Sequence, residues 1–590
     1  DELFATLDEY NHSFYLDNKR RFYLGILSLH KSDKGPFTTI ETIEFDNMDD
    51  SMLKYFFDFI KSNFDKSIPL LFKPSSHFQE NLINNIDQIE IPRVFNHELF
   101  KSSNFLALNP GQSKGRLRVF YNEQEYIESQ ASLEWYDIIV MPKVPDNIQR
   151  VSGIINAEFT TPLSHTNILA SGWQIPNAVC TEILDKVEKE KLDGCWVQYE
   201  VKSTVDHVIL NKIDKPTEVS KQPVWSVQRI KLEQPDTHEY KIKNLNELRM
   251  SDQYRYGTKA ANIGELNHVL SSGSEKLLGF YRIKRPPREN LLPYIADYLK
   301  ANDQDKDLEE KAITYLKQNI SIPNGIALPF SIQQSFLQSS PGIQQAIGKL
   351  KMGLELKARQ VDALCIRLQQ MIVQTRMPDQ LRGQIDSFIA KNLAGVSSFV
   401  VRSSSNAEDL EHFSAAGIYE SFNHVTTADN IFESIKKVWS SLLSPRSIRL
   451  RDDVGISLDD CYMGVIIQEE VKSDMGGVMV TTNPLDRNDL FRDVYLNVSS
   501  QSVTNVVQGS ELPYQYLYNT LEGGGKTVSI GNAKEDLPKI QKAKLQNLAI
   551  AGRLLQSHFS PDYTFSTPLD IEWVSYGDKM YIVQLRPYVK

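Results

Sequence analysis

The feature that most constrains the fold of this chain is a series of short apolar segments between residues 105 and 212, each closed by turn residues. The series follows the turn cluster Asn109-Pro110-Gly111-Gln112, and it contains a helical stretch from about His165 to Ser171 that stops at Gly172. Short apolar runs bounded by Gly, Pro, Asn or Asp are typical of buried strands. This pattern predicts a β/α unit at 105–212 with strands at Gly115–Tyr121, Tyr136–Met141, Gly153–Asn156, Val197–Val201 and Val205–Leu210.

A smaller α/β unit is predicted at 1–104. Arg21 to Leu29 is apolar and aromatic at the density of a strand, and Ile68 to Phe72 has the pattern of a buried strand. Between them, Met52 to Phe64 carries apolar residues at helical spacing. The segment contains no motif with recognisable chemistry, so the sequence alone assigns it no role.

The third predicted unit, 250–590, is the largest. It contains a mostly helical region, Pro329 to Phe388, which is followed by strands at Phe399–Val401, Gly464–Gln468, Gly477–Thr481, Asp570–Val574 and Met580–Leu585. The stretch 275–320 is rich in charge and Pro. We predict a solvated surface excursion there, with contact to a partner or acceptor as the alternative.

Residues 213–249 are predicted to link the second and third units. Pro216, Pro223 and Pro235 stand there among Lys, Gln, Glu and Thr, a composition typical of linkers. Fully extended, about 30 residues reach on the order of 100 Å. Such a segment would permit a large displacement of one unit relative to the other.

Composition excludes several classes of protein. The chain has 590 residues, 41% of them hydrophobic, which is enough for several cores, and no apolar run approaches the roughly 18 residues needed to span a bilayer. With 65 Lys and Arg against 75 Asp and Glu, the net charge of −10 gives no support to a nucleic-acid partner. The four cysteines are scattered without a CxxC pair, which favours reduced thiols and a cytoplasmic location.

His165 is the first residue whose position indicates chemistry. An apolar strand ends in the polar turn before it, and a helix begins at it. The positive end of a helix disfavours protonation of an imidazole, and a neutral ring nitrogen is a competent nucleophile towards phosphorus. Amides at a helix start can also steady a phosphate, although a lone His there is more often a capping or packing residue.

Two cationic side chains in the third unit have the setting of phosphate ligands. Lys259 follows a glycine turn at Gly257, which alone is a weak signal. Arg402 leaves a buried strand and enters a Ser-rich loop, a setting that suits bidentate contact with phosphate. The alternative for Arg402 is a structural role in which it donates to carbonyls of the loop.

The C-terminal strands bring together oxygen ligands and a guanidinium. Both strands alternate, so Asp570 and Glu572 share one face of their strand, as Gln584 and Arg586 do on theirs. Hard oxygen ligands beside an arginine are what a magnesium–nucleotide site needs. Charge pairs on a solvated sheet edge are the alternative.

Residues 156–178 resemble the phosphohistidine segment of enzymes that use phosphoenolpyruvate or a pyrophosphoryl donor. Two pairs depart from that pattern: Pro162-Leu163 stands where small residues precede Ser164, and Gly172-Trp173 replaces the usual Arg-Glu. The resemblance implies that His165 carries the phosphoryl group on a swivelling domain. The matching positions are Thr161, Ser164, His165, Ile168, Ala170, Ile175, Pro176 and Ala178.

The strings around Lys259, Arg402 and Glu572, in this order, resemble the nucleotide-binding domain of pyruvate phosphate dikinase and phosphoenolpyruvate synthase, which is of the two-lobed ATP-grasp type. The resemblance covers essentially 250–590 and implies ATP as substrate with Mg2+ (or Mn2+) as cofactor. Asn505 stands where the family has a Glu, so one carboxylate expected near the nucleotide is missing. The implied roles are phosphate binding for Lys259, Arg402 and Arg586, metal binding for Glu572 and Gln584, and an adenine pocket at Gln468, Glu469 and Val471.

The order of the units resembles the C-terminal half of glucan, water dikinases, and no barrel of about 250 residues fits in the chain. The resemblance implies an ATP-dependent dikinase-type phosphotransferase with His165 and Arg402 as catalytic residues, releasing AMP and phosphate. The acceptor is not identified, and a small molecule, a glucan or a protein remain open. The alternative is a non-catalytic nucleotide-binding or phosphocarrier relative that works with a separate acceptor subunit or a missing domain.

Overall fold

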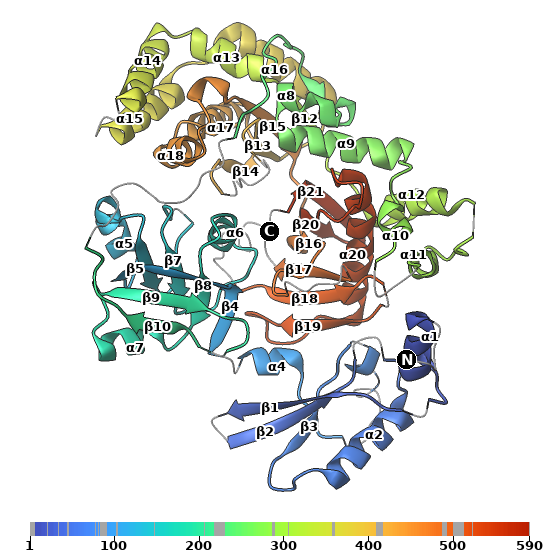
Figure 1. The fold of residues 1–590 in the computed structure, drawn as a ribbon. Helices are drawn as coiled ribbons and strands as arrows, with labels where there is room; N and C mark the ends of the chain where they lie inside the picture. The colour runs from blue at the N-terminus through green and yellow to red at the C-terminus, as the bar shows by residue number, and fades with distance from the viewer. Residues whose placement is uncertain are drawn as a thin grey trace.

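The computed structural model has four β-sheets, each with its own helices (Figure 1). It describes the chain except for residues 1–5, 21, 33–34, 44–45, 77, 81, 83–90, 102–103, 147, 206, 218–229, 286–289, 305, 357–359, 409–416, 487–491, 500–511, 522 and 589–590. The prediction of an α/β chain built from several units is confirmed. Within the described residues, no helix has the length and apolar content needed to cross a bilayer.

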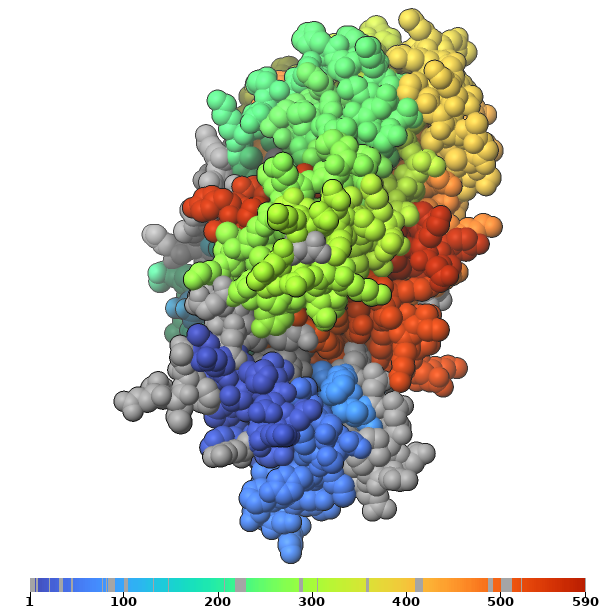
Figure 2. Space-filling view, turned by 90° about the vertical axis from the view of Figure 1, so that its right-hand side faces the viewer, coloured from blue at the N-terminus to red at the C-terminus, as the bar shows by residue number. Residues whose placement is uncertain are grey.

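The N-terminal unit contains a three-stranded sheet in the order β1 (Ile26–Ser32), β2 (Gly35–Glu41) and β3 (Leu70–Phe72). Helix α2 (Asp50–Asn63) supplies the buried Phe56 and Phe57 to its core. Asp49 caps this helix, because its side chain accepts a hydrogen bond from the Met52 amide. Figure 1 shows this unit beneath β18 and β19, and Figure 2 shows it below the helices of residues 250–320.

The second unit is a seven-stranded sheet whose four central strands, β5 to β8, are parallel. Its helices are α5 (Glu123–Ser129), α6 (His165–Gly172) and α7 (Ile183–Glu190). The strand order is β10 (Ile209–Lys212), β9 (Trp196–Val201), β5 (Gly111–Val119), β6 (Asp137–Met141), β7 (Gly153–Asn156), β8 (Asn177–Cys180) and β4 (Phe105–Asn109).

A five-stranded antiparallel sheet forms the upper part of the third unit in Figure 1. Its order is β11 (Lys243–Asn244), β12 (Gly325–Leu328), β15 (Met463–Glu469), β13 (Phe399–Ser405) and β14 (Ser421–Val425). Residues 230–249 of the predicted linker lie on this part, since β11 joins the sheet and Leu232 and Ile242 are buried in its core. Its helices are α13 (Phe330–Gln338), α14 (Pro341–Glu355), α15 (Val361–Gln374), α16 (Asp379–Asn392), α17 (Ala428–Ser441) and α18 (Pro445–Asp453).

A six-stranded antiparallel sheet forms the rest of the third unit. Helix α20 (Lys539–Phe559) packs on it, and α8 (Gln253–Tyr256) and α9 (Thr258–Ser272) connect it to the five-stranded sheet. The order is β19 (Gly525–Ser529), β18 (Tyr514–Asn519), β17 (Asp493–Ser499), β16 (Met475–Val480), β20 (Leu569–Tyr576) and β21 (Lys579–Pro587).

The prediction that 275–320 is a solvated surface excursion is wrong for its described residues. They form α10 (Gly279–Arg282), α11 (Leu292–Tyr298) and part of α12 (Leu308–Asn319), which runs beside α20 (Figure 1). Phe280, Ile295 and Leu316 are buried in the same core as the six-stranded sheet. Removing this apolar surface from water outweighs the polar composition of the segment.

Candidate active site

A cavity of about 820 Å³ lies where the second unit meets both sheets of the third unit. Asp146 and His165 come from the second unit, and the other lining residues come from the third. All nine residues that the sequence predicts as site residues line this cavity: His165, Lys259, Arg402, Gln468, Glu469, Val471, Glu572, Gln584 and Arg586. The structure therefore brings the predicted residues together, while their roles stay predictions.

Strands β20 and β21 position the C-terminal group. Asp570 lies directly opposite Arg586, and Glu572 lies directly opposite Gln584. Arg586 Nε donates to Asp570 Oδ2 at 2.9 Å, and a second guanidinium nitrogen lies 2.8 Å from the same oxygen. The alternation in sequence therefore produces two cross-strand pairs on neighbouring positions of one face.

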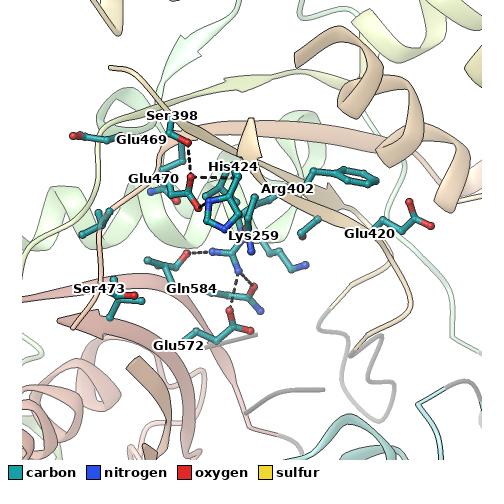
Figure 3. A pocket seen from close by; sticks show the side chains of 18 of the residues that line it. Lys259, Ser398, Arg402, Glu420, His424, Glu469, Glu470, Ser473, Glu572 and Gln584 are labelled. Atoms are coloured by element: carbon teal, nitrogen blue, oxygen red, sulfur yellow. Dashed lines mark hydrogen bonds and ion pairs between the residues drawn. The ribbon is translucent and has the colours of Figure 1, made fainter. Parts of the chain in front are cut away.

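Arg402 joins the two sheets across the cavity, as Figure 3 shows. From β13, its Nη2 donates to Glu572 Oε2 at 2.8 Å and to Gln584 Oε1 at 2.9 Å, and its Nη1 donates to Val583 O at 2.8 Å. Burial by itself would raise the pKa of the Glu572 carboxyl, but the positive charges around it, led by Arg402 and Arg586, hold that pKa below its ordinary value. Glu572 is therefore an ionised carboxylate close to the positive charges of Arg402 and Arg586.

Lys259 reaches the cavity from the first turn of α9. Gly257 precedes the helix at φ +86°, and a Cβ on it would lie 2.0 Å from Ser404 O, so only glycine allows this approach of the helix start to β13. Lys259 Nζ lies 3.0 Å from Glu408 Oε1 and 3.1 Å from Ser403 Oγ.

Glu408 is a residue of this site that sequence reasoning missed. It is buried, and its carboxylate also accepts from Ser403 Oγ at 3.2 Å and from the Ser405 amide at 3.0 Å. The signal that could have found it is its place in the same Ser-rich string as Arg402, where a carboxylate follows a strand that carries a cation.

The end of β15 forms another wall of the cavity. Gln468 Nε2 donates to Pro323 O at 3.1 Å, and the Glu469 amide donates to Asn324 O at 2.8 Å, which fixes the strand end against the segment before β12. Glu470 accepts from the Ser398 hydroxyl at 2.5 Å and lies 2.9 Å from His424 Nδ1 (Figure 3). Sequence reasoning assigned no role to Ser398 or His424, and it included Glu470 only as part of the segment from Gln468 to Val471.

His165 is the first residue of α6, with Ser164 as the N-cap. Its Nδ1 lies 3.1 Å from Asp146 Oδ2, and its side chain is 15% exposed. Asp146 is a second residue that sequence reasoning missed, because nothing along the chain ties the segment after β6 to the start of α6.

The two departures from the phosphohistidine pattern lie in contacts between units. Leu163 is buried in a cluster with residues of the six-stranded sheet, including Val478 and Tyr495. Trp173 packs against both the core of its own unit and the core of the five-stranded sheet. Beside Leu163, Asn497 Nδ2 donates to Thr161 Oγ1 at 3.1 Å. These contacts hold the unit that carries His165 at the cavity.

The oxygens predicted as metal ligands converge on one point. Glu572 Oε2 and Gln584 Oε1 both accept from the same nitrogen of Arg402. Among the described residues, no group of three or more His, Cys, Asp or Glu side chains has the arrangement of a metal site. Asn505, where the family has a carboxylate, lies outside the described residues.

Comparison with known proteins finds a family match within the third unit. Residues 308–522 match the family model described as pyruvate phosphate dikinase, AMP/ATP-binding domain. This range contains Arg402 and the segment from Gln468 to Val471, and it leaves out His165, Lys259 and the β20–β21 residues.

Three relatives illustrate the similarity. A rifampicin phosphotransferase of Bacillus subtilis is 26% identical over 287 residues, which cover 46% of this chain and 32% of the relative. A probable phosphoenolpyruvate synthase of Archaeoglobus fulgidus is 28% identical, over 46% of this chain and 38% of the relative. A probable phosphoenolpyruvate synthase of Pyrococcus horikoshii is also 28% identical, over 59% of this chain and 43% of the relative. The chain thus spans less than half the length of each. The predicted resemblance to the phosphoenolpyruvate synthase and pyruvate phosphate dikinase superfamily is confirmed.

Proposed function

We propose that this chain is an ATP-dependent phosphotransferase of the dikinase type, in which His165 takes a phosphoryl group from ATP and passes it to a second substrate. The observation that carries the proposal is that His165 lines the same cavity as Lys259 and Arg402. A nucleophile and the groups that hold its phosphoryl donor must share one space, because transfer requires contact and in-line approach. The phosphotransferase and synthase names of the relatives support the same class of reaction.

ATP is proposed to lie between the two sheets of the third unit, as the two lobes of an ATP-grasp domain. Lys259, Arg402 and Arg586 would contact the phosphates, and the segment from Gln468 to Val471 would border the adenine. Each of the three cations is paired with a carboxylate, Glu408, Glu572 or Asp570. A polyphosphate can replace part of these pairings, since it offers the same charge-assisted hydrogen bonds.

Glu572 and Gln584 suit a divalent cation, Mg2+ or Mn2+. Their oxygens already meet at one cationic nitrogen, and carboxylate and amide oxygens are hard ligands. When bound, the cation would neutralise charge on the phosphate oxygens. The protein residues contribute the rest: they hold the phosphates and set the direction of attack.

In the proposed reaction, Nε2 of a neutral His165 attacks the β-phosphorus of ATP. The new N–P bond replaces the bond from that phosphorus to the oxygen that bridges to the α-phosphate, and the electron pair leaves with AMP. Water then releases the γ-phosphate, as the resemblance implies, so that one phosphoryl group stays on the histidine. The unit at 105–212 would then move to the acceptor, in the unit order of glucan, water dikinases. Residues 230–249 of the predicted linker would stay with the third unit, because they pack on its five-stranded sheet.

The acceptor is proposed only as a class: a small molecule, a glucan or a protein. The names of the relatives point to a small molecule, since they mention rifampicin and phosphoenolpyruvate. A screen of such acceptors that records AMP release, with His165→Ala as the blank, would identify it.

The direct test uses ATP labelled at the β-phosphorus. We expect acid-labile label on the wild-type protein and none on His165→Ala, with ATP binding unchanged in the variant. Absence of label on a wild-type protein that binds ATP would refute the proposal. It would favour instead a nucleotide-binding or phosphocarrier relative that requires a separate subunit or domain.

A further inference from the structure

We infer that Asp146 is the positioning residue for His165: its carboxylate keeps the imidazole proton on Nδ1, so that the lone pair of Nε2 is available in the cavity. This inference rests on the proposed function, because it concerns the same histidine. The first observation is the 3.1 Å distance between Asp146 Oδ2 and His165 Nδ1. An ionised carboxylate only accepts hydrogen bonds, so the nitrogen facing it is the one that carries the proton.

The Asp146 carboxylate is itself held at the start of α6. Its other oxygen, Oδ1, lies 3.3 Å from the hydroxyl of Thr166, which is also 3.3 Å from Val144 O. Thr166 follows His165 directly, so the two oxygens of one carboxylate contact two consecutive residues of the first helical turn. A carboxylate fixed at both oxygens restricts the rotation of the imidazole that it faces.

A second and independent observation comes from the third unit. Gly417 has φ +65°, and a Cβ on it would lie 2.3 Å from His165 Nδ1. Its carbonyl accepts from Arg446 Nη1 at 3.0 Å, which anchors this backbone to α18. The Nδ1 edge of the ring is therefore covered by a carboxylate of its own unit and by a backbone of the other. These contacts obstruct the approach of a phosphorus atom to Nδ1, which leaves Nε2 as the nitrogen for transfer.

The Asp146 carboxylate is expected to act on the positive charge that the imidazole ring acquires during transfer. When Nε2 forms the N–P bond and AMP leaves with the electron pair, the ring acquires a positive charge while Nδ1 keeps its proton. The carboxylate beside Nδ1–H stabilises that charge and requires no further reactant. Asp146 thus acts through His165, whose Nδ1 it contacts.

Two substitutions separate positioning from a structural role. Asp146→Asn keeps the shape of the side chain but offers an amide that donates to Nδ1 of His165. The ring proton then lies on Nε2, so this nitrogen has no free lone pair for attack. Asp146→Ala leaves both tautomers available. We expect label from β-labelled ATP to appear about 100-fold more slowly in Asp146→Asn, and about tenfold more slowly in Asp146→Ala. Glu158→Gln, which removes an exposed carboxylate from the segment between β7 and α6 of the same unit, is the matched control and should label at the wild-type rate.

The order of the rates decides the inference, because loss of a structural contact would harm the alanine variant more than the asparagine variant. Equal rates in Asp146→Asn and wild type, or a slower rate in Asp146→Ala, would overturn it while leaving the proposed function standing. Melting temperature and ATP affinity are measured for each variant.

The labelled wild-type protein supplies a test without any variant: after base hydrolysis, the label should be on Nε2 of histidine, and label on Nδ1 would overturn the inference.

Discussion

Replacing Leu163 with alanine should weaken the contact between the unit at 105–212 and the six-stranded sheet while leaving both folded. The Leu163 side chain is 1% exposed, and the other members of its apolar cluster belong to the six-stranded sheet or to residues beside it. The substitution removes about three carbon atoms from this contact, which at about 0.8 kcal/mol each amounts to about 2.4 kcal/mol. A change of that size lowers the equilibrium constant for docking about 50-fold.

Two measurements follow the docking equilibrium. Small-angle X-ray scattering should record a larger radius of gyration for Leu163→Ala, because the unit that carries His165 separates from the cavity more often. The rate at which β-labelled ATP labels His165 should fall by up to about 50-fold, since only the docked state brings the histidine to the nucleotide. ATP affinity should stay the same, because Leu163 does not line the cavity.

Leu356→Ala is the matched control, since the same atoms are removed from a side chain that is 75% exposed. It should change neither scattering nor labelling. If Leu163→Ala gave the wild-type scattering curve and the wild-type labelling rate, the reasoning that this apolar contact holds the unit in place would be refuted.

Three further predictions concern single residues. Gly417→Ala should slow labelling of His165 by about tenfold or more, because the added Cβ meets the imidazole; wild-type labelling would contradict this. Glu572→Gln should raise the Mg2+ concentration needed for half-maximal labelling, and an unchanged metal titration would exclude Glu572 as a ligand. Burial raises the pKa of Asp46 to about 6, despite the Arg20 side chain 3.0 Å away. The folded state therefore binds the Asp46 proton more tightly than the unfolded state does. The contribution of this group to the free energy of unfolding is present at low pH and is lost as pH rises through about 6. Asp46→Asn should flatten the dependence of the free energy of unfolding on pH, measured by urea unfolding between pH 4 and 8.

Alternating patterns predicted the C-terminal part of the site well. In a strand, residues two apart share a face, so the pairing of Asp570 with Arg586 and of Glu572 with Gln584 required only that the two strands be neighbours in register. The helix at His165 was also predicted with its correct start, because the polar turn before it is a local signal.

The roles of residues that act through partners distant in sequence could not be predicted from the sequence. Asp146 contacts a histidine 19 positions away, and Gly417 approaches the same ring from a different unit. The stretch 275–320 was interpreted wrongly for a related reason: its polar composition is visible in the sequence, but the sheet that buries its apolar residues is formed by strands far along the chain.

The sequence by itself determined the types of element, the family resemblance and the residues capable of phosphoryl chemistry, because these depend on periodicity, turn residues and side-chain type. Only the tertiary structure decided that Arg402 meets Glu572, 170 positions away, and that His165 lies at the same cavity. Those contacts depend on how three sheets pack, and packing is governed by the burial of whole apolar faces, to which residues distant in sequence contribute jointly.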